Sequence, residues 1–152
     1  MADQTFSGPY VQVAAICTTP LVEPTGNVSV IRIQDRVQLA GPTDQMQPQA
    51  LNSLWLVLVL KSGSMNGKYT LRIVPVTPSG TPLPTLEFSV LFEGQERGAL
   101  VSFPLPFVAQ EEGLYWFEIR LEDALLTKIP LRVMYQKMQM MPGMAFPPPP
   151  HD

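Results

Sequence analysis

The 152-residue sequence predicts an all-β protein, an antiparallel sandwich of about 7–9 short strands. Three observations support this prediction. Apolar and polar residues alternate in about eight segments, turns rich in Gly and Pro separate them, and no stretch shows the apolar period of a long helix. The length fits one domain, and an apolar fraction of 45% against 15% charged residues indicates that most of the chain folds.

The patterning divides the chain into three regions. Residues 1–9 carry no pattern and are predicted to be a flexible N-terminus, whereas residues 10–136 carry the alternating segments and form the sandwich domain. Residues 137–152 are rich in Met and Pro and end in a run of four prolines before the last two residues. We expect this region to be a disordered proline-rich C-terminal tail whose proline run is an extended polyproline helix.

Two strands are predicted before residue 34. In the first, YVQVAAIC, alternate residues share one face by the two-residue period of a strand. These residues are Val11, Val13, Ala15 and Cys17. A turn with two prolines and a glycine follows, and NVSVIRI over residues 27–33 is the second strand.

The middle of the chain contains one long connection and a hairpin. Residues 34–50 include two prolines and a glycine, and predict a connection with room for one short helical turn. The apolar run LWLVLVL, residues 54–60, predicts a central strand buried on both faces. The turn GSMNG joins it to KYTLRIVPV, residues 68–76, in which apolar and polar residues alternate as in a half-exposed strand.

The last strands are predicted between residues 86 and 135. LEFSVLF and ALVSFPLPFVA each alternate. Because proline has no N–H to donate, Pro104 and Pro106 mark the latter as an edge strand, or as a strand whose outer donors face water. The stretch EEGLYWFEIRLEDALLTKIPLRV, residues 111–133, is the clearest hairpin, with its turn at Glu122 and Asp123.

A tyrosine motif opens this hairpin. Glu111, Gly113, Tyr115 and Phe117 have the spacing found at the corner before the penultimate strand of immunoglobulin-like sandwiches, with Phe117 in place of the disulfide cysteine. A tyrosine at such a corner buries its ring while its hydroxyl bonds backbone groups left unpaired by the bend. Trp55 lies in the strand where these folds commonly bury a tryptophan. Together with the strand count, the motif favours an immunoglobulin-like sandwich over a barrel.

The order of segments also resembles a known family. A cysteine-bearing first strand is followed by VSVIRIQDRV, LWLVLVLKSG and EGLYWFEIRLEDALLTKIPLRV between residues 10 and 135. This order resembles a family of small uncharacterised bacterial proteins with an immunoglobulin-like β-sandwich. The resemblance implies the fold and no activity, so it assigns no functional residue, and both terminal extensions lie outside it.

The inventory of reactive side chains argues against catalysis. The single histidine, His151, is the penultimate residue, so a Ser–His or Cys–His site and a zinc site lack the groups they need. Cys17 is predicted to be a small buried hydrophobe, and a lone cysteine suits a reducing compartment such as the cytoplasm. GSMNGK has the glycines of a phosphate loop but not its spacing. We expect no enzymatic activity and no cofactor.

Carboxylates are the remaining candidates for chemistry. Glu111 with Glu112, and Glu122 with Asp123, are adjacent acidic pairs that calcium could use. We interpret them as solvated charges at strand ends and expect no metal site. A hydrolase that uses two carboxylates stays open as a third and weaker alternative.

Charge and hydropathy restrict the partners. A net charge of −3 with scattered Lys and Arg offers no basic stripe for nucleic acid. The N-terminus lacks the basic and apolar regions of a signal peptide, and an apolar run of seven residues is too short to span a membrane. We therefore expect neither nucleic-acid nor membrane binding, and the sequence does not indicate an oligomeric state.

Surface recognition is the function that these observations leave. Trp116 alternates with the outward Glu118 and is predicted to point outward, where it could contact a protein or stack on a sugar unless a loop or the tail covers it. The tail adds soft apolar and polyproline residues that suit grooves on a partner. The partner-binding candidates are Trp116, Met138, Met141, Phe146, Pro147 and Pro148. We predict a non-catalytic binding or accessory module for a protein partner, with a carbohydrate-binding module that uses exposed aromatics as the alternative.

Overall fold

The computed structural model describes residues 7–139, which form eleven β-strands and no helix. The strands are β1 (Tyr10–Val22), β2 (Val28–Ile33), β3 (Arg36–Gly41), β4 (Gln49–Leu51), β5 (Trp55–Lys61), β6 (Asn66–Val76), β7 (Leu86–Glu93), β8 (Gly98–Pro104), β9 (Phe107–Ala109), β10 (Gly113–Leu121) and β11 (Ala124–Lys137). The predicted all-β class is therefore confirmed. Within the described residues there is accordingly no helix of the length and apolarity that crossing a bilayer requires.

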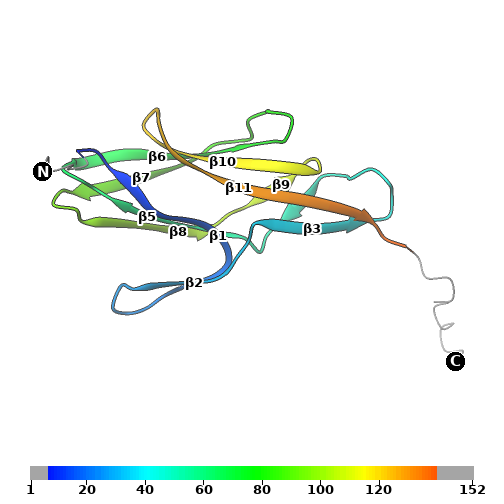
Figure 1. Ribbon diagram of the computed structural model, residues 1–152, viewed down its shortest axis with the longest axis horizontal. Coiled ribbons are helices and arrows are strands. Elements are labelled where there is room, and N and C mark those ends of the chain that lie inside the picture. The colour runs from blue at the N-terminus through cyan, green and yellow to red at the C-terminus, as the bar shows by residue number, and fades with distance from the viewer. Residues whose placement is uncertain (1–6, 140–152) are drawn as a thin grey trace, which may run out of the picture.

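Two sheets form the sandwich (Figure 1). One has the strand order β2-β1-β5-β8 and the other the order β3-β11-β10-β6-β7, while β4 and β9 form a separate short pair. The apolar faces of the two sheets meet in one core. Its largest fully buried side chains are Tyr115, Phe92, Phe117, Ile16, Leu56, Leu58, Leu60, Leu71, Ile73, Leu105, Ile119 and Leu131.

The β10–β11 hairpin has the predicted position and faces. Phe117 lies opposite Ile129 and Tyr115 opposite Leu131, and all four side chains are buried in the core. The two-residue turn at Glu122 and Asp123 joins the strands where the sequence predicts it. On its other side β10 pairs with β6, so this hairpin forms the centre of the five-stranded sheet.

Strand β5 is buried on its core face and, at its centre, on the opposite face as well, so the burial predicted from its continuous apolar run holds at the middle of the strand. Leu56, Leu58 and Leu60 enter the core, while Val57 on the opposite face is also 0% exposed. The hairpin formed by the second half of β1 and by β2 accounts for the second face. Its tip at residues 26–28 lines a cavity of about 380 Å³ together with residues of β5 and β8, and Figure 1 shows the hairpin lying below these strands.

The predicted inward face of β1 is wrong in part. A register shift between Val11 and Val13 interrupts the alternation, so Ile16 joins the core and Val13 is 38% exposed. Ala15 and Cys17 are buried, but on the side of the sheet away from the main core cluster. A β-bulge adds one residue to a strand and exchanges its two faces, which the two-residue period cannot show.

The predicted connection over residues 34–50 is also corrected, because it contains strands β3 and β4 and no helical turn. Strand β3 pairs in parallel with the end of β11, almost a hundred residues later in the chain. The segment predicted as one strand after residue 98 is divided at Leu105 into β8 and β9, which belong to different sheets. The edge position predicted from the prolines is confirmed, because β8 ends its sheet.

Candidate functional site

The outer face of the five-stranded sheet carries side chains in rows across β11, β10 and β6. One row is apolar, because Trp116 lies between Pro130 of β11 and Val76 of β6. In the adjacent row Glu118 lies between Lys128 and Val74. This outward face, centred on Trp116, is called the Trp116 face below.

Trp116 itself is 37% exposed, so none of the described residues covers it fully. The Nζ atom of Lys128 lies 5.9 Å from the centre of its indole ring. At this distance a cation is attracted to the electron-rich ring face, by about 0.5–1 kcal/mol at an exposed site. The indole is therefore held by a neighbouring charge and still presents apolar surface to solvent.

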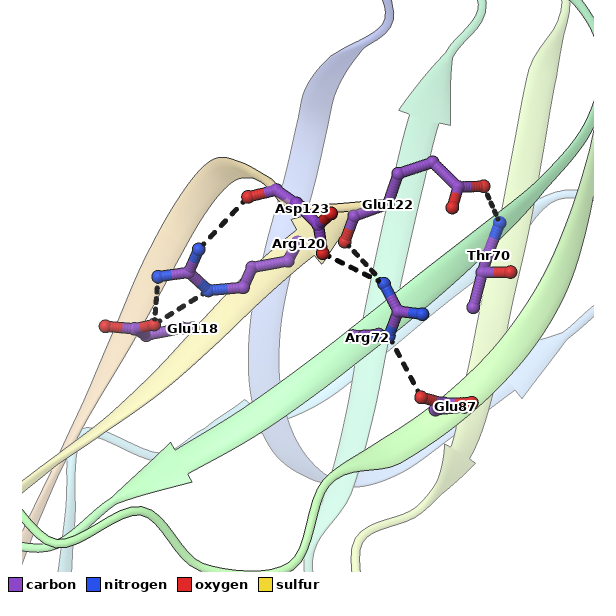
Figure 2. A network of polar contacts seen from close by, with 7 residues as sticks. All are labelled: Thr70, Arg72, Glu87, Glu118, Arg120, Glu122 and Asp123. Atoms are coloured by element: carbon purple, nitrogen blue, oxygen red, sulfur yellow. Dashed lines mark hydrogen bonds and ion pairs between the residues drawn. The ribbon is translucent and has the colours of Figure 1, made fainter.

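Two arginines mark the charged end of the same face, beside the β10–β11 turn (Figure 2). Arg72 Nε donates to Glu87 Oε1 at 2.9 Å and Arg72 Nη1 donates to the Glu122 carbonyl at 2.8 Å. The hydrogen bond with Glu87 raises the pKa of Arg72 above its usual range. Nη1 also lies 3.5 Å from the Asp123 carboxylate. Arg72 thus ties the turn to β6 and β7.

Arg120 makes the second set of contacts in Figure 2. Its Nη2 and Nε atoms donate to Glu118 Oε2 at 2.7 and 2.9 Å, and its Nη1 donates to the Asp123 carbonyl at 3.2 Å. Glu122 holds a left-handed φ of 50°, and its carboxylate accepts from the Thr70 amide at 2.7 Å. Each arginine is paired with at least one carboxylate, and the contacts together hold the turn in place. Their arrangement suits a fixed polar border rather than bond chemistry.

The tyrosine motif lies at the opposite end of β10. The Tyr115 hydroxyl accepts from the amides of Gln110 and Glu111 and donates to the Glu111 carbonyl, each at 2.9 Å. Its ring is 0% exposed and meets Phe107 edge-on, with centroids 5.0 Å apart. Phe117 contacts the ring of Phe107, with centroids 5.4 Å apart. This is the bonding expected of a tyrosine at a sandwich corner, and it is structural.

Two further residues of the motif hold the corner against the loop before β7. Glu111 Oε1 accepts from the hydroxyl and the amide of Ser79 at 2.7 and 3.1 Å, and the hydroxyl bond in particular lowers the pKa of the carboxyl. Gly113 has a φ of 135°, and a Cβ atom there would lie 2.9 Å from Pro78. Trp55 differs from the expectation, since it is only half-buried and lies outside the core cluster.

Met138, the other predicted binding residue within residues 7–139, does not join the Trp116 face. Met138 is 56% exposed and its amide donates to the Gly41 carbonyl at 2.8 Å. It lies about eight residues along the chain from Pro130, the neighbour of Trp116, which corresponds to roughly 26 Å of extended strand. The other tail candidates, Met141, Phe146, Pro147 and Pro148, lie outside the described residues, as does His151.

The acidic pairs considered for calcium are separated rather than gathered. Glu111 and Glu112 precede β10, and Glu122 and Asp123 follow it, so the nine residues of that strand stand between the pairs. Nine extended residues span about 30 Å. Among residues 7–139, no three His, Cys, Asp or Glu side chains are grouped as metal ligands would be. Cys17 is 0% exposed, and burial raises the pKa of its thiol, which disfavours a reactive thiolate.

A concave apolar site lies elsewhere, at one end of the sandwich, with a volume of about 370 Å³. Its lining residues are Pro75, Leu83, Pro84, Leu86, Pro106, Phe107, Val108 and Gln110. Gln110 is the one residue of this lining with a polar side chain, so the depression can receive an apolar group but offers no acid, base or nucleophile. Sequence reasoning did not find it, because its walls come from loops and strands far apart in the chain.

The two packed sheets and the tyrosine corner together have the architecture of an immunoglobulin-like β-sandwich. A scan of family models found no match, and a search of curated proteins found none either. Solved structures show distant likeness. An immunoglobulin-like protein from Pseudomonas aeruginosa is similar with a TM-score of 0.42 and 12% identity, over 86% of this chain and 99% of that one.

Parts of larger enzymes show the same degree of likeness. A β-glucosidase from Listeria innocua, in complex with glucose, has a TM-score of 0.45 and 15% identity over 82% of this chain. A β-D-glucoside glucohydrolase from Trichoderma reesei has a TM-score of 0.45 and 12% identity over 84% of this chain. The chain spans only 16% and 19% of the lengths of these two proteins. At such TM-scores and identities the likeness carries no conclusion about the activity or partners of this chain.

Proposed function

We propose that this protein is a non-catalytic binding module that recognises a protein partner through the Trp116 face. The supporting observation is the position of Trp116, which is 37% exposed in a row between Pro130 and Val76. Large aromatic side chains that expose apolar surface next to polar groups contribute much of the energy of protein interfaces. In this proposal, Trp116 is the anchor of the interface.

The neighbouring charges suggest what the partner presents. Glu118, Arg120 and Arg72 already have charged partners within the molecule, so they form a polar border around the apolar row. Lys128 has its amine above the indole, where it can also meet an acceptor on the partner. A matching partner surface therefore carries an apolar side chain over Trp116 and an acidic group beside Lys128.

A carbohydrate is the second candidate. The observation that favours it is the same indole, which lies on a sheet face beside the hydrogen-bonding groups of Glu118 and Arg120. A sugar stacks its C–H face on an aromatic ring and needs such polar groups at its rim. These groups are already bonded to each other at 2.7 Å, which leaves them less free for hydroxyls and makes this the second choice.

We propose further that the chain belongs to the bacterial family it resembles and acts in the cytoplasm. The order of its strands and the corner at Tyr115 support the first proposal. The unbridged, buried Cys17 supports the second, because such a thiol suits a reducing compartment.

The binding proposal is tested with one variant and one matched control. Trp116→Ala removes the anchor, whereas Leu91→Ala removes an exposed apolar side chain, 54% exposed, from β7 of the same sheet. Both side chains point outward, so we expect both variants to keep the circular dichroism spectrum and melting temperature of the wild type. A partner retained from lysate of the source organism is then produced and titrated against all three proteins.

We expect Trp116→Ala to weaken binding about tenfold or more, which is the usual effect of truncating an interface anchor, and Leu91→Ala to change it less than about twofold. Equal binding by Trp116→Ala and wild type contradicts the proposed face. A glycan array decides the alternative. The carbohydrate alternative is supported if wild type binds a glycan, Trp116→Ala does not bind it, and no protein partner is retained from lysate. That result contradicts the proposal of a protein partner.

A further inference from the structure

Strand β2 is the end strand of the four-stranded sheet and pairs only with the second half of β1. In Figure 1 the hairpin that they form lies below β5 and β8, with β2 as its outer strand. One edge of β2 therefore has no neighbouring strand within the described part of the chain.

The hydrogen bonds of the hairpin show which groups point toward that edge. At its tip, the Glu23 amide donates to the Asn27 carbonyl at 2.8 Å. Positions in an antiparallel ladder alternate between pairs that exchange backbone hydrogen bonds and pairs that do not. The pair two residues further along, Leu21 and Ser29, therefore also exchanges hydrogen bonds, and the Ser29 backbone is directed toward β1.

At the positions between these pairs, the backbone groups of β2 point away from β1. Val28 lies opposite Val22 and Val30 lies opposite Pro20, in the pairs that do not exchange hydrogen bonds. Pro20 has no N–H, which agrees with this alternation because a residue in a pair that does not exchange hydrogen bonds donates none to β2. The N–H and C=O groups of Val28 and Val30 thus point away from β1, toward the open edge of β2.

The other sheet ends have features that discourage strand addition. Strand β8 ends in Pro104, and β7 carries the acidic Glu87 on its outward face. In β3 the Ala40 carbonyl accepts from the side chain of Gln49 at 3.1 Å. Strand β2 has no proline, and its one charged residue, Arg32, which has a left-handed φ of 57°, lies near its end, beyond the segment from Val28 to Val30. Natural proteins usually protect such an edge, so an unprotected one indicates an intended neighbour.

The outward face of the hairpin is apolar around the same point. Leu21 is 47% exposed and pairs with Ser29, and Ile31 is 41% exposed two residues further along β2. Ile33, at the end of β2, is 69% exposed, whereas Val22, which is 57% exposed, points to the opposite face of the hairpin. Adding a strand at the edge would bring this surface beside a second apolar surface.

We propose that β2 pairs antiparallel with β2 of a second copy of the chain, around a two-fold axis at Ser29. In this register Val28 of each copy lies opposite Val30 of the other, and the outward N–H and C=O groups of both residues are satisfied. The edge is complementary to itself, because it offers the same donors and acceptors in the order that a two-fold axis requires. Leu21 and Ile31 of each copy then flank Ser29 on one face of the extended sheet.

A cysteine cross-link tests the register. On the axis, the Cβ atoms of the two Ser29 residues would lie about 4.5–5.5 Å apart, close to the range that a disulfide accepts. Under mild oxidation we expect Ser29→Cys to form a covalent dimer of twice 16.8 kDa on a non-reducing gel. The matched control is Ser89→Cys, an exposed serine on β7 of the other sheet. Wild type is a second control, because its Cys17 is fully buried.

Sedimentation equilibrium of the full chain gives the second readout. We expect a concentration-dependent dimer, because one hairpin edge is a small interface. Ser29→Lys places like charges on the axis and should weaken the dimer about tenfold or more, whereas Ser89→Lys should leave it unchanged. A wild type that stays monomeric at about 1 mM overturns the proposal, as does equal cross-linking or equal weakening by the Ser29 and Ser89 variants. The edge lies on the four-stranded sheet, so these results are independent of the Trp116 face.

Discussion

The Tyr115 hydroxyl donates to the carbonyl oxygen of Glu111, four residues earlier, across 2.9 Å. The hydroxyl oxygen of Tyr115 in turn accepts from the backbone amides of Gln110 and Glu111. One phenol group therefore satisfies three backbone groups at the bend that leads into β10. The Trp116 face begins at the next residue, so the corner also sets the start of the strand that presents the indole.

Replacing Tyr115 by phenylalanine tests the energetic importance of this corner. Tyr115→Phe keeps the buried ring and leaves three backbone groups without their partner, which should lower the free energy of unfolding by about 1–3 kcal/mol. Urea unfolding measures the change. Tyr69→Phe is the control, because its hydroxyl makes a single bond, to the Asn66 carbonyl at 3.2 Å, and we expect a loss below about 1 kcal/mol. A neutral Tyr115→Phe would mean that the bend is held by other contacts.

Gly113→Ala should also destabilise the protein. The φ of 135° at this position is one that side chains rarely adopt, and the new Cβ would lie 2.9 Å from Pro78 Cβ and Cγ. We expect a loss of about 1–3 kcal/mol, measured by the same unfolding experiment. Gly8→Ala provides the comparison, since no atom lies within 4 Å of a Cβ placed there. If the two alanine variants are equally stable, the corner tolerates a change of its backbone.

The contact between Ser79 and Glu111 should make stability depend on pH. The Ser79 hydroxyl bond holds the pKa of Glu111 below its ordinary value of 4.5. A lowered pKa stabilises the folded state above the unfolded-state value, and this stabilisation disappears as the pH falls through the folded-state pKa. Ser79→Ala should therefore melt below wild type at pH 7, and the difference should shrink toward pH 2. Ser89→Ala lacks such a carboxylate contact, so a similar pH profile in that variant would contradict the assignment.

The end of β11 should contribute to stability beyond the expected domain boundary at residue 136. Lys137 pairs with Gly41 and lies 3.1 Å from the Asp44 carboxylate, and the Met138 amide donates to the Gly41 carbonyl. A chain that ends at Gln136 should unfold about 1 kcal/mol more easily than one that ends at Gln139, mainly through the lost backbone bonds. Thermal unfolding of the two chains measures the difference. Identical unfolding transitions would mean that residues 137–139 contribute nothing to stability.

Local patterns were sufficient for much of the fold. The alternation in residues 111–133 predicted both strands of the β10–β11 hairpin and their inward residues, and the continuous apolar run predicted the burial of β5 on both faces at its centre. Pro104 predicted an edge strand because a missing N–H is a local property. The sequence also predicted that Trp116 points outward. Its neighbours Val76 and Lys128 were not predicted, because the local pattern of a single strand does not determine its register with another strand.

The sequence by itself determined that this protein is an all-β sandwich with a tyrosine corner, because side-chain period and turn chemistry act within a few residues. Only the tertiary structure decided the bulge after Val11, the parallel pairing of β3 with β11, and the row that places Pro130 beside Trp116. It also decided that the open edge of β2 belongs to a hairpin lying over the four-stranded sheet. These features depend on hydrogen bonds and contacts between segments far apart in the chain. The local sequence pattern of one segment does not determine the free energy of such contacts.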